Sequence, residues 1–273
     1  MMDLNGRSVI LTGASGGIGA ALCDELVAAG ACVLAVGRDP VRLAQVAGRH
    51  PQGRVLPLPL DLSTPAGRAQ LLGAAAALPI RPSLLLIAHA QSGFGLFAEQ
   101  SEQDLRQLLD TNLMAPMLLV RALLPLLQAQ PQATVVAVGS TFGSLGFPGF
   151  AGYSASKFGL RGLFEALARE YADSHVRFQY LAPRATRTAF NTAQVDAMNQ
   201  ELKVGADTPE RVARALRQAI ERGDRRLQIG WPEKLFARLN GALPGLVDRS
   251  LKAQLPVVRR HAARAPSRFG DAR

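Results

Sequence analysis

The sequence predicts an α/β fold: a doubly wound, seven-stranded parallel sheet followed by a C-terminal helical extension. Two observations predict it. Seven short apolar runs alternate with segments of helical spacing, as expected for strands that helices bury on both faces. Hydrophobic residues make up 48% of the 273 residues and charged residues 19%, which suffices for a full core. Right-handed crossovers between parallel strands then favour the nucleotide-binding arrangement.

The first half of the chain alternates β-rich runs with helices. Ile18, Leu22 and Leu26 recur at helical spacing until Gly30, a residue type that commonly follows the last helical turn. Pro65 stands where a helix can begin. The expected order is strand 8–12, helix 18–30, strand 32–36, helix 41–47, strand 55–60, helix 66–78 and strand 84–88.

The second half continues the alternation. Ser101 and Asp104 resemble a capping box at the start of a long helix, which Pro116 is expected to bend. Thr208 and Pro209 fit the N-cap and first turn of a later helix. The expected order is helix 101–128, strand 134–138, helix 153–171, strand 176–181, helix 208–222 and strand 227–229.

Three regions are predicted: a nucleotide-binding domain at 1–230, an amphipathic helical extension at 231–258, and an Arg-, Ala- and Pro-rich tail at 259–273 that we expect to fray. Apolar residues from Pro232 to Leu255 approximate a helical stripe, broken by Gly241 and Pro244 and flanked by basic side chains. The stripe either packs on its own domain or a partner subunit, or lies on an anionic membrane surface.

The formal net charge of +10 is unevenly placed. Residues 1–206 contain 16 basic and 14 acidic side chains, whereas residues 207–273 contain 15 and 7. A nearly neutral core without a recognition module disfavours nucleic-acid binding, and the possible membrane contact is confined to residues 232–273. Cys23 and Cys32 are too few for a disulfide framework. With no secretory signal, no transmembrane helix and no metal site predicted, we expect a cytoplasmic protein, with peripheral contact to a membrane as the alternative left open.

A glycine-rich run, Thr12-Gly13-Ala14-Ser15-Gly16-Gly17-Ile18-Gly19, connects the first strand to the first helix. Glycines at this junction allow a tight turn and let a pyrophosphate approach the helix N-terminus. Dinucleotide sites that select NAD place an acidic residue after the second strand, where this chain has Gly37 and Arg38. Because arginine pairs with a 2′-phosphate, we expect NADP(H), unless Arg38 pairs with Asp39 or points into solvent.

Tyr153 and Lys157 are four residues apart on one predicted helix, and Ser140 follows the fifth strand. At this spacing the two side chains share a helix face, so we expect the ammonium group to lower the pKa of the phenol. A tyrosine with its ordinary pKa of about 10 exchanges protons poorly at neutral pH. The set therefore predicts a proton-transfer site.

These motifs resemble those of the short-chain dehydrogenase/reductase family over about residues 6–230. The resemblance implies a catalytic set of Asn112, Ser140, Tyr153 and Lys157. It also implies, together with Arg38, cofactor binding by Gly13, Ser15, Gly16, Gly17, Ile18, Gly19, Asp61, Leu62, Ala90, Tyr153, Lys157, Pro183 and Thr188. Asn112 would position a water molecule that links Lys157 to solvent. Family members commonly pair through the helices that carry Asn112 and Tyr153, so a homodimer or homotetramer is expected.

Two positions depart from the family pattern. Residues 88–91 read Ala-His-Ala-Gln in place of Asn-Asn-Ala-Gly, so His89 is either a structural histidine or an added acid or base. Arg184 replaces the glycine of a Pro-Gly pair. Arg184 and Arg187 either bind a cofactor phosphate, a substrate carboxylate or a phosphopantetheine arm, or belong to a solvated loop.

The expected function is an NADPH-dependent reductase that transfers a hydride to a lipophilic ketone, aldehyde or 3-oxoacyl substrate. Six phenylalanines follow the fourth, fifth and sixth strands, where substrate enters such folds: Phe94, Phe97, Phe142, Phe147, Phe150 and Phe190. Residues 188–206 would form a flap over the substrate. The alternative is a non-catalytic NADP(H)-binding regulatory or scaffold protein, consistent with the altered segment 88–91 and the basic extension.

Overall fold

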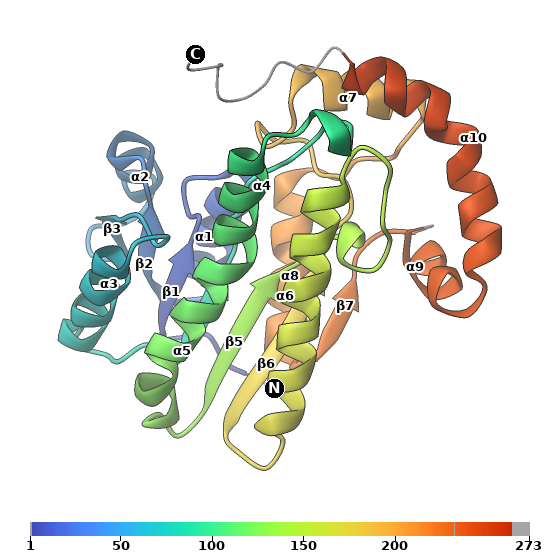
Figure 1. Ribbon diagram of the computed structural model, residues 1–273. Helices are drawn as coiled ribbons and strands as arrows, with labels where there is room; N and C mark the ends of the chain where they lie inside the picture. Colours follow the sequence, from blue (N-terminus) through green and yellow to red (C-terminus); the bar gives the residue numbers. More distant parts are fainter. Residues whose placement is uncertain (1, 232, 264–273) are drawn as a thin grey trace.

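The computed structural model describes residues 2–231 and 233–263. All seven strands are parallel and lie in one sheet in the order β3-β2-β1-β4-β5-β6-β7, which confirms the predicted doubly wound fold (Figure 1). The strands are β1 Ser8–Thr12, β2 Cys32–Gly37, β3 Val55–Pro59, β4 Leu84–Ile87, β5 Ala133–Val138, β6 Val176–Ala182 and β7 Arg226–Gln228. Every residue of β1, β4 and β5 is buried, as helices on both faces require. Pro57 and Pro59 lie in edge strand β3, where a missing N–H is tolerated.

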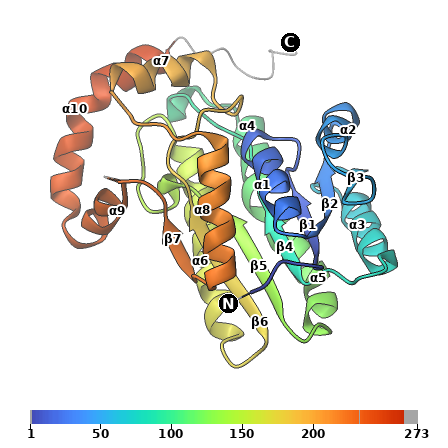
Figure 2. The ribbon, with the colours of Figure 1, turned by 180° about the vertical axis from the view of Figure 1, so that it is seen from behind.

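Helices cover both faces of the sheet. One apolar cluster joins the sheet to α1 Gly17–Ala28, α2 Pro40–Ala47 and α8 Pro209–Arg222, which Figure 2 shows in front. The opposite cluster joins it to α3 Pro65–Ala77, α5 Ala115–Gln128 and α6 Ala151–Glu170. Leu22, Leu26, Leu216 and Ile220 are fully buried on the first face, and Leu119 and Leu160 on the second. The helical spacing seen in the sequence therefore corresponds to these buried stripes.

The predicted helix 101–128 is divided by a widened turn. Ser101 caps α4 Glu102–Leu109, its hydroxyl accepting a hydrogen bond from the Asp104 amide at 3.0 Å. A π-helical segment, Asp110–Met114, then leads into α5. Pro116 has no N–H to donate to the Asn112 carbonyl, so the distortion precedes the proline by one turn. The stretch Glu102–Gln128 is long and apolar enough to cross a bilayer, but it packs in this protein core through Leu119, Leu123 and Leu127.

The C-terminal part contains helices that the sequence placed only approximately. Helix α7 Ala193–Glu201 lies within the predicted flap, and α9 Glu233–Ala242 and α10 Pro244–Ala262 form the extension. Gly241 does not interrupt the extension, since α9 continues through it. The two helices are separated at Leu243, directly before Pro244. Helix α10 also continues through Arg259 and Arg260, where fraying was expected; the rest of that predicted tail, 264–273, and Pro232 lie outside the described residues.

Candidate active site

A cavity of about 1670 Å³ opens at the carboxyl ends of the strands. The loops that follow β1, β2, β4, β5 and β6 all contribute to its walls. Of the catalytic and cofactor-binding residues predicted from the sequence, all but Asn112 line it. The cavity has two parts, one beside the glycine-rich loop and one surrounded by phenylalanines. Tyr153 lines the cavity together with the residues of both parts.

The glycine-rich loop forms a cradle that side chains would fill. Gly13 has a φ of +69°, and a Cβ there would lie 2.6 Å from the backbone nitrogen of His89. A Cβ at Gly17 would overlap the methyl group of Thr188, and one at Gly19 the Gly13 carbonyl. Helix α1 begins at Gly17 without a side-chain cap, so its first amides are left for an anion. The cradle fits the pyrophosphate of a dinucleotide.

Two arginines lie beside this cradle. Arg38 is exposed and lines the cavity after β2. The Asp39 carboxylate caps α2 through the Arg42 amide at 3.0 Å, so the pairing with Arg38 that the sequence left open is not formed. Arg42 also lines the cavity, and its guanidinium donates to the Ser15 carbonyl at 2.8 Å. Sequence reasoning missed Arg42, although it lies only four residues after Arg38, in the first turn of α2.

Asp61 lies across the same part of the cavity. Its carboxylate accepts hydrogen bonds from the Ser63 hydroxyl at 2.7 Å and the Ser63 amide at 3.0 Å. The hydroxyl bond is the main reason that the pKa of Asp61 falls below its ordinary value, and the charge of Arg38 lowers it further. Asp61 is therefore an ionised acceptor beside Leu62, and both residues line the cavity as predicted for cofactor binding.

Ser140, Tyr153 and Lys157 meet at the end of β5. The Ser140 hydroxyl hydrogen-bonds the Tyr153 phenol. The ammonium of Lys157 lies 5.8 Å from the centre of the Tyr153 ring and donates to the Val138 carbonyl at 3.3 Å. Lys157 is 2% exposed, and burial lowers its pKa to about 8. The lysine therefore remains mostly protonated at pH 7.

The expected lowering of the Tyr153 pKa is wrong for this structure. Burial raises the pKa of Tyr153 to about 12, and the hydrogen bond from Ser140 only partly opposes that rise. The cost of burying a phenolate exceeds the stabilisation that its neighbours provide. Tyr153 is consequently a fully protonated group at neutral pH.

Tyr180 of β6 supports this set and was missed in the sequence. Its hydroxyl accepts a hydrogen bond from the Ser140 amide at 3.3 Å and donates to the Lys157 carbonyl at 3.4 Å. A Cβ at Gly139 or Gly143 would overlap the Tyr180 side chain. The two glycines thus make room for a buried hydroxyl that ties the end of β5 to α6.

The family profile described as short chain dehydrogenase matches residues 7–199. The chain belongs to the short-chain dehydrogenase family. The oxidoreductase claN of Passalora fulva is 32% identical over 216 residues, which cover 78% of this chain and 97% of that protein. The ketoacyl reductase HetN of Nostoc sp. is 30% identical over 224 residues, covering 81% of this chain and 77% of that protein.

Solved structures of this family have the same architecture. A short-chain dehydrogenase from Streptomyces avermitilis has 28% sequence identity and a TM-score of 0.78, and the match covers 94% of this chain and 99% of that chain. A Sphingobium yanoikuyae short-chain dehydrogenase in complex with NADPH has 25% identity and a TM-score of 0.76, covering 89% and 95%. The similarity therefore extends well beyond the glycine-rich loop.

Asn112, the family's helix asparagine, holds the segment that departs from the short-chain dehydrogenase pattern. Its amide accepts from the Gln91 amide at 2.7 Å and donates to the Gln91 carbonyl at 2.9 Å and the Ser156 hydroxyl at 3.1 Å. Asn112 is 1% exposed and lies outside the cavity lining. It thus fixes the chain after β4 against α6, and the predicted water-positioning role stays a prediction.

His89 fills an asparagine position of the family motif. Its Nδ1 lies 2.7 Å from the Thr12 hydroxyl, while its Nε2 is buried without a hydrogen-bond partner among the described residues. Burial is the main cause that lowers the pKa of His89 to about 4, and the charges of Lys157 and Arg38 add to it. A neutral ring that bonds to β1 supports the structural interpretation over an added acid.

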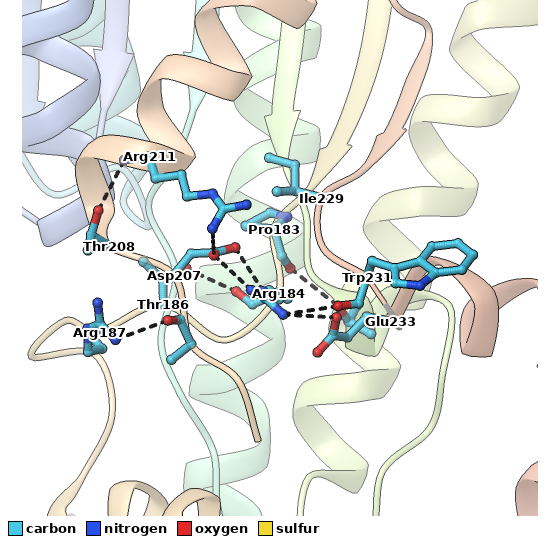
Figure 3. Close-up of polar contacts among 12 residues, drawn as sticks. Pro183, Arg184, Thr186, Arg187, Asp207, Thr208, Arg211, Ile229, Trp231 and Glu233 are labelled. Carbon is cyan, nitrogen blue, oxygen red and sulfur yellow. Dashed lines mark hydrogen bonds and ion pairs between the residues drawn. The ribbon is translucent and has the colours of Figure 1, made fainter. Parts of the chain in front are cut away.

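Arg184, which replaces a short-chain dehydrogenase glycine, belongs to an ion-pair cluster (Figure 3). Its guanidinium donates to both oxygens of Asp207 at 2.9 Å, and one nitrogen lies 3.5 Å from a Glu233 oxygen. Asp207 is 3% exposed and also pairs with Arg211 at 3.2 Å. The cluster ties the loop after β6 to the segments before α8 and α9, so Arg184 is neither free for a phosphate nor solvated. Arg187 donates to the Ala206 carbonyl at 3.2 Å.

The aromatic part of the cavity only partly follows the prediction. Phe142, Phe147, Phe150 and Phe190 line it, with the Phe190 ring 6.0 Å from that of Tyr153. Phe94 packs behind Phe150 at 5.0 Å, and Phe97 is 62% exposed, so neither lines the cavity. The outer wall was missed: it consists of Phe236 from α9 and of Val247, Ser250, Leu251 and Gln254 from α10.

Proposed function

We propose that the protein is an NADPH-dependent reductase of lipophilic ketones, aldehydes or 3-oxoacyl compounds. One observation carries the proposal. A protonated Tyr153, hydrogen-bonded to Ser140, lines a single cavity together with a dinucleotide cradle and an aromatic chamber. Carbonyl reduction consumes a proton, and the phenol can donate one to the carbonyl oxygen as negative charge develops there.

The preference for NADP(H) is supported by charge. Arg38 and Arg42 stand beside the cradle where NAD-selective sites have an acidic residue, and a guanidinium binds a 2′-phosphate through paired hydrogen bonds. Similar solved structures include one in complex with NADPH and one in complex with NAD, so the proposed preference rests on the charge of the two arginines. Replacing both arginines with glutamate is expected to lower the affinity for NADPH at least tenfold and to leave that for NADH nearly unchanged.

Each residue of the site has a separate role in the proposed reaction. When bound, the nicotinamide cofactor supplies the hydride for the carbonyl carbon. Tyr153 donates its proton to the carbonyl oxygen as negative charge develops there, and Ser140 hydrogen-bonds the same oxygen. Lys157 holds the cofactor ribose and keeps a positive charge near the phenol. The aromatic walls exclude water and orient an apolar substrate, which supports the lipophilic substrate class.

Turnover tests this function. NADPH consumption is followed over a panel of ketones, aldehydes and 3-oxoacyl thioesters, with Tyr153→Phe as the matched variant. We expect the variant to lose at least a thousandfold in kcat/KM while NADPH binding stays within threefold. Turnover that survives Tyr153→Phe contradicts the assigned proton donor. Tight NADPH binding without turnover of any substrate favours the scaffold alternative.

A homodimer is also proposed. Leu109, Met114, Met117 and Phe158 are 36–46% exposed on the helical stretch that carries Asn112 and on α6. Exposed apolar side chains on these helices support pairing through this face. We expect light scattering to give a mass of about twice the 29.0 kDa chain, and Met117→Glu with Phe158→Glu to give a monomer.

A further inference from the structure

Helices α9 and α10 form a hairpin that exposes apolar side chains. Five of the sixteen large apolar residues that are exposed in the described chain fall within residues 231–246. They are Trp231 (67% exposed), Leu235 (42%), Phe236 (37%), Leu243 (53%) and Leu246 (56%). We call these five the hairpin surface. Exposed apolar side chains that are concentrated in one segment of the chain indicate a contact site.

The hairpin has separate contacts with its own domain. Val247, Val258 and Ala262 of α10 are at most 2% exposed, and Val258 belongs to an apolar cluster with Val195 and Met198 of α7. The Asn240 amide donates to the Ser144 carbonyl at 3.0 Å. The hairpin is thus fixed at the periphery of the molecule, as Figures 1 and 2 show. The side chains of the hairpin surface remain exposed.

Positive charge accompanies the hairpin surface. Residues 231–263 contain six Lys or Arg and only two acidic residues, Glu233 and Asp248. Glu233 is paired with Arg184, and Arg260 with Glu201. Of the six cations, only Arg260 takes part in an ion pair among the described residues. Lys234, Arg238, Arg249 and Lys252 lie in or next to the segment that carries the hairpin surface, so their charges are free to meet an anionic surface. A second copy of this chain would present the same positive charge and be repelled.

The hairpin surface also borders the cavity. Phe236 is 37% exposed and lines the cavity, and Val247 and Leu251 of the next helix line it as well. The same hairpin therefore forms the outer wall of the substrate chamber and an apolar, cation-flanked surface. Basic side chains around apolar and tryptophan side chains are the combination that anionic bilayers bind.

We propose that the hairpin surface docks on an anionic lipid bilayer and that the chamber takes its carbonyl substrate directly from that bilayer. The substrate part of this proposal rests on the proposed reductase function. The docking part rests on the hairpin alone. Trp231, Leu243 and Leu246 enter the interface between head groups and acyl chains, and the four free cations contact the head groups. A lipophilic substrate then reaches Phe236 without crossing water.

Vesicle co-sedimentation of the full chain tests the docking step. We expect at least tenfold stronger binding to phosphatidylcholine vesicles with 30% phosphatidylserine than to phosphatidylcholine alone, and weaker binding at 0.5 M NaCl. Leu243→Glu with Leu246→Glu should abolish it. Ile80→Glu is the matched control because Ile80 is a comparably exposed apolar residue, 53%, outside the hairpin. Equal binding to both vesicles, or no effect of the hairpin variant, would overturn the proposal.

Two further readouts separate the possible outcomes. The hairpin variant should reduce a short, water-soluble ketone at the wild-type rate but a vesicle-embedded long-chain ketone at least fivefold more slowly. Vesicle binding without turnover of either ketone means that the proposed function fails and docking stands. The membrane proposal is overturned if the wild-type protein does not bind vesicles and the hairpin variant loses self-association in light scattering. In that case a second copy of the chain occupies the hairpin surface.

Discussion

His89 places a titratable ring against Thr12, where other members of the family have an uncharged asparagine. The ring is neutral at pH 7, because burial lowers its pKa to about 4 from 6.5. Between these two values the unfolded chain binds more protons than the folded one. The contribution of His89 to stability therefore falls as the pH drops from 6.5 to 4.

We expect His89→Asn to flatten this acid dependence. At about 1.4 kcal/mol per pKa unit, the wild-type loss attributable to His89 is at most roughly 3 kcal/mol at pH 4. Thermal unfolding at pH 7.0 and 4.5 measures it: the fall in Tm should be smaller in the variant than in the wild type. His175→Asn, a change at an exposed histidine, should retain the wild-type fall. Equal falls in His89→Asn and wild type would refute the explanation.

Single residues show where sequence reasoning worked and where it stopped. The glycines of residues 13–19 and the set of Ser140, Tyr153 and Lys157 could be placed, because local spacing fixes their backbone geometry. The partner of Arg184 could not be predicted, since Asp207 is 23 residues away and reaches it only through the fold. The predicted direction of the Tyr153 pKa shift was wrong for a related reason: burial, which the sequence does not display, outweighs the opposing effect of Ser140.

At the scale of elements, the Arg184 cluster joins three segments that are separate in the sequence. The loop after β6 carries Pro183 and Thr188, which line the cofactor part of the cavity, and Arg184 anchors that loop to Asp207. Removing Asp207 leaves a guanidinium that is 15% exposed without its two strong bonds. Removing Arg184 leaves Asp207 with Arg211 as a partner.

Asp207→Asn should therefore cost more stability than Arg184→Gly. We expect losses of about 3 kcal/mol for the first and about 1 kcal/mol for the second in urea unfolding. Both variants should raise the KM for NADPH severalfold with a smaller change in kcat, because the loop that carries Thr188 is loosened. Equal stability losses, or an unchanged KM in both variants, would contradict this positioning role.

Some helix boundaries could be predicted from local sequence and others could not. The capping residues Ser101 and Thr208 could be located from local sequence, and both caps are present. The π-helical segment and α7 were not predicted, because a widened turn and a short helix with few buried residues leave weak periodicity. The end of α10 was misjudged because Val258 and Ala262 are buried against distant elements.

At the scale of the whole molecule, activity and stability should respond oppositely to alkaline pH. The proposed reduction uses a protonated Lys157, whose folded pKa of about 8 lies below its ordinary 10.5. Activity therefore falls as pH rises through about 8. Over the same range the unfolded chain binds more protons at this lysine, so the lysine's contribution to stability rises.

The range from about pH 8 to 9 tests the opposite responses of activity and stability. At higher pH the buried Cys23, whose pKa is raised from 9.0 to about 12, lowers the stability of the folded chain and opposes the effect of Lys157. We expect kcat/KM for reduction to fall severalfold between pH 7 and 9. The stability difference between wild type and Lys157→Met should shift in favour of the wild type over the same interval. Activity and stability that fall together would point to alkaline unfolding instead.

The outer wall of the chamber has a consequence for how this protein can diversify. Phe236, Val247 and Leu251 lie beyond residue 199, where the match to the family profile ends. The proposed proton donor, Tyr153, and the glycine-rich cradle lie before it. Insertions or substitutions in the hairpin can thus alter which molecules are accepted while leaving the sheet and its chemistry intact. Selection for a new substrate can therefore change the hairpin without changing the segment that carries the cofactor cradle and Tyr153.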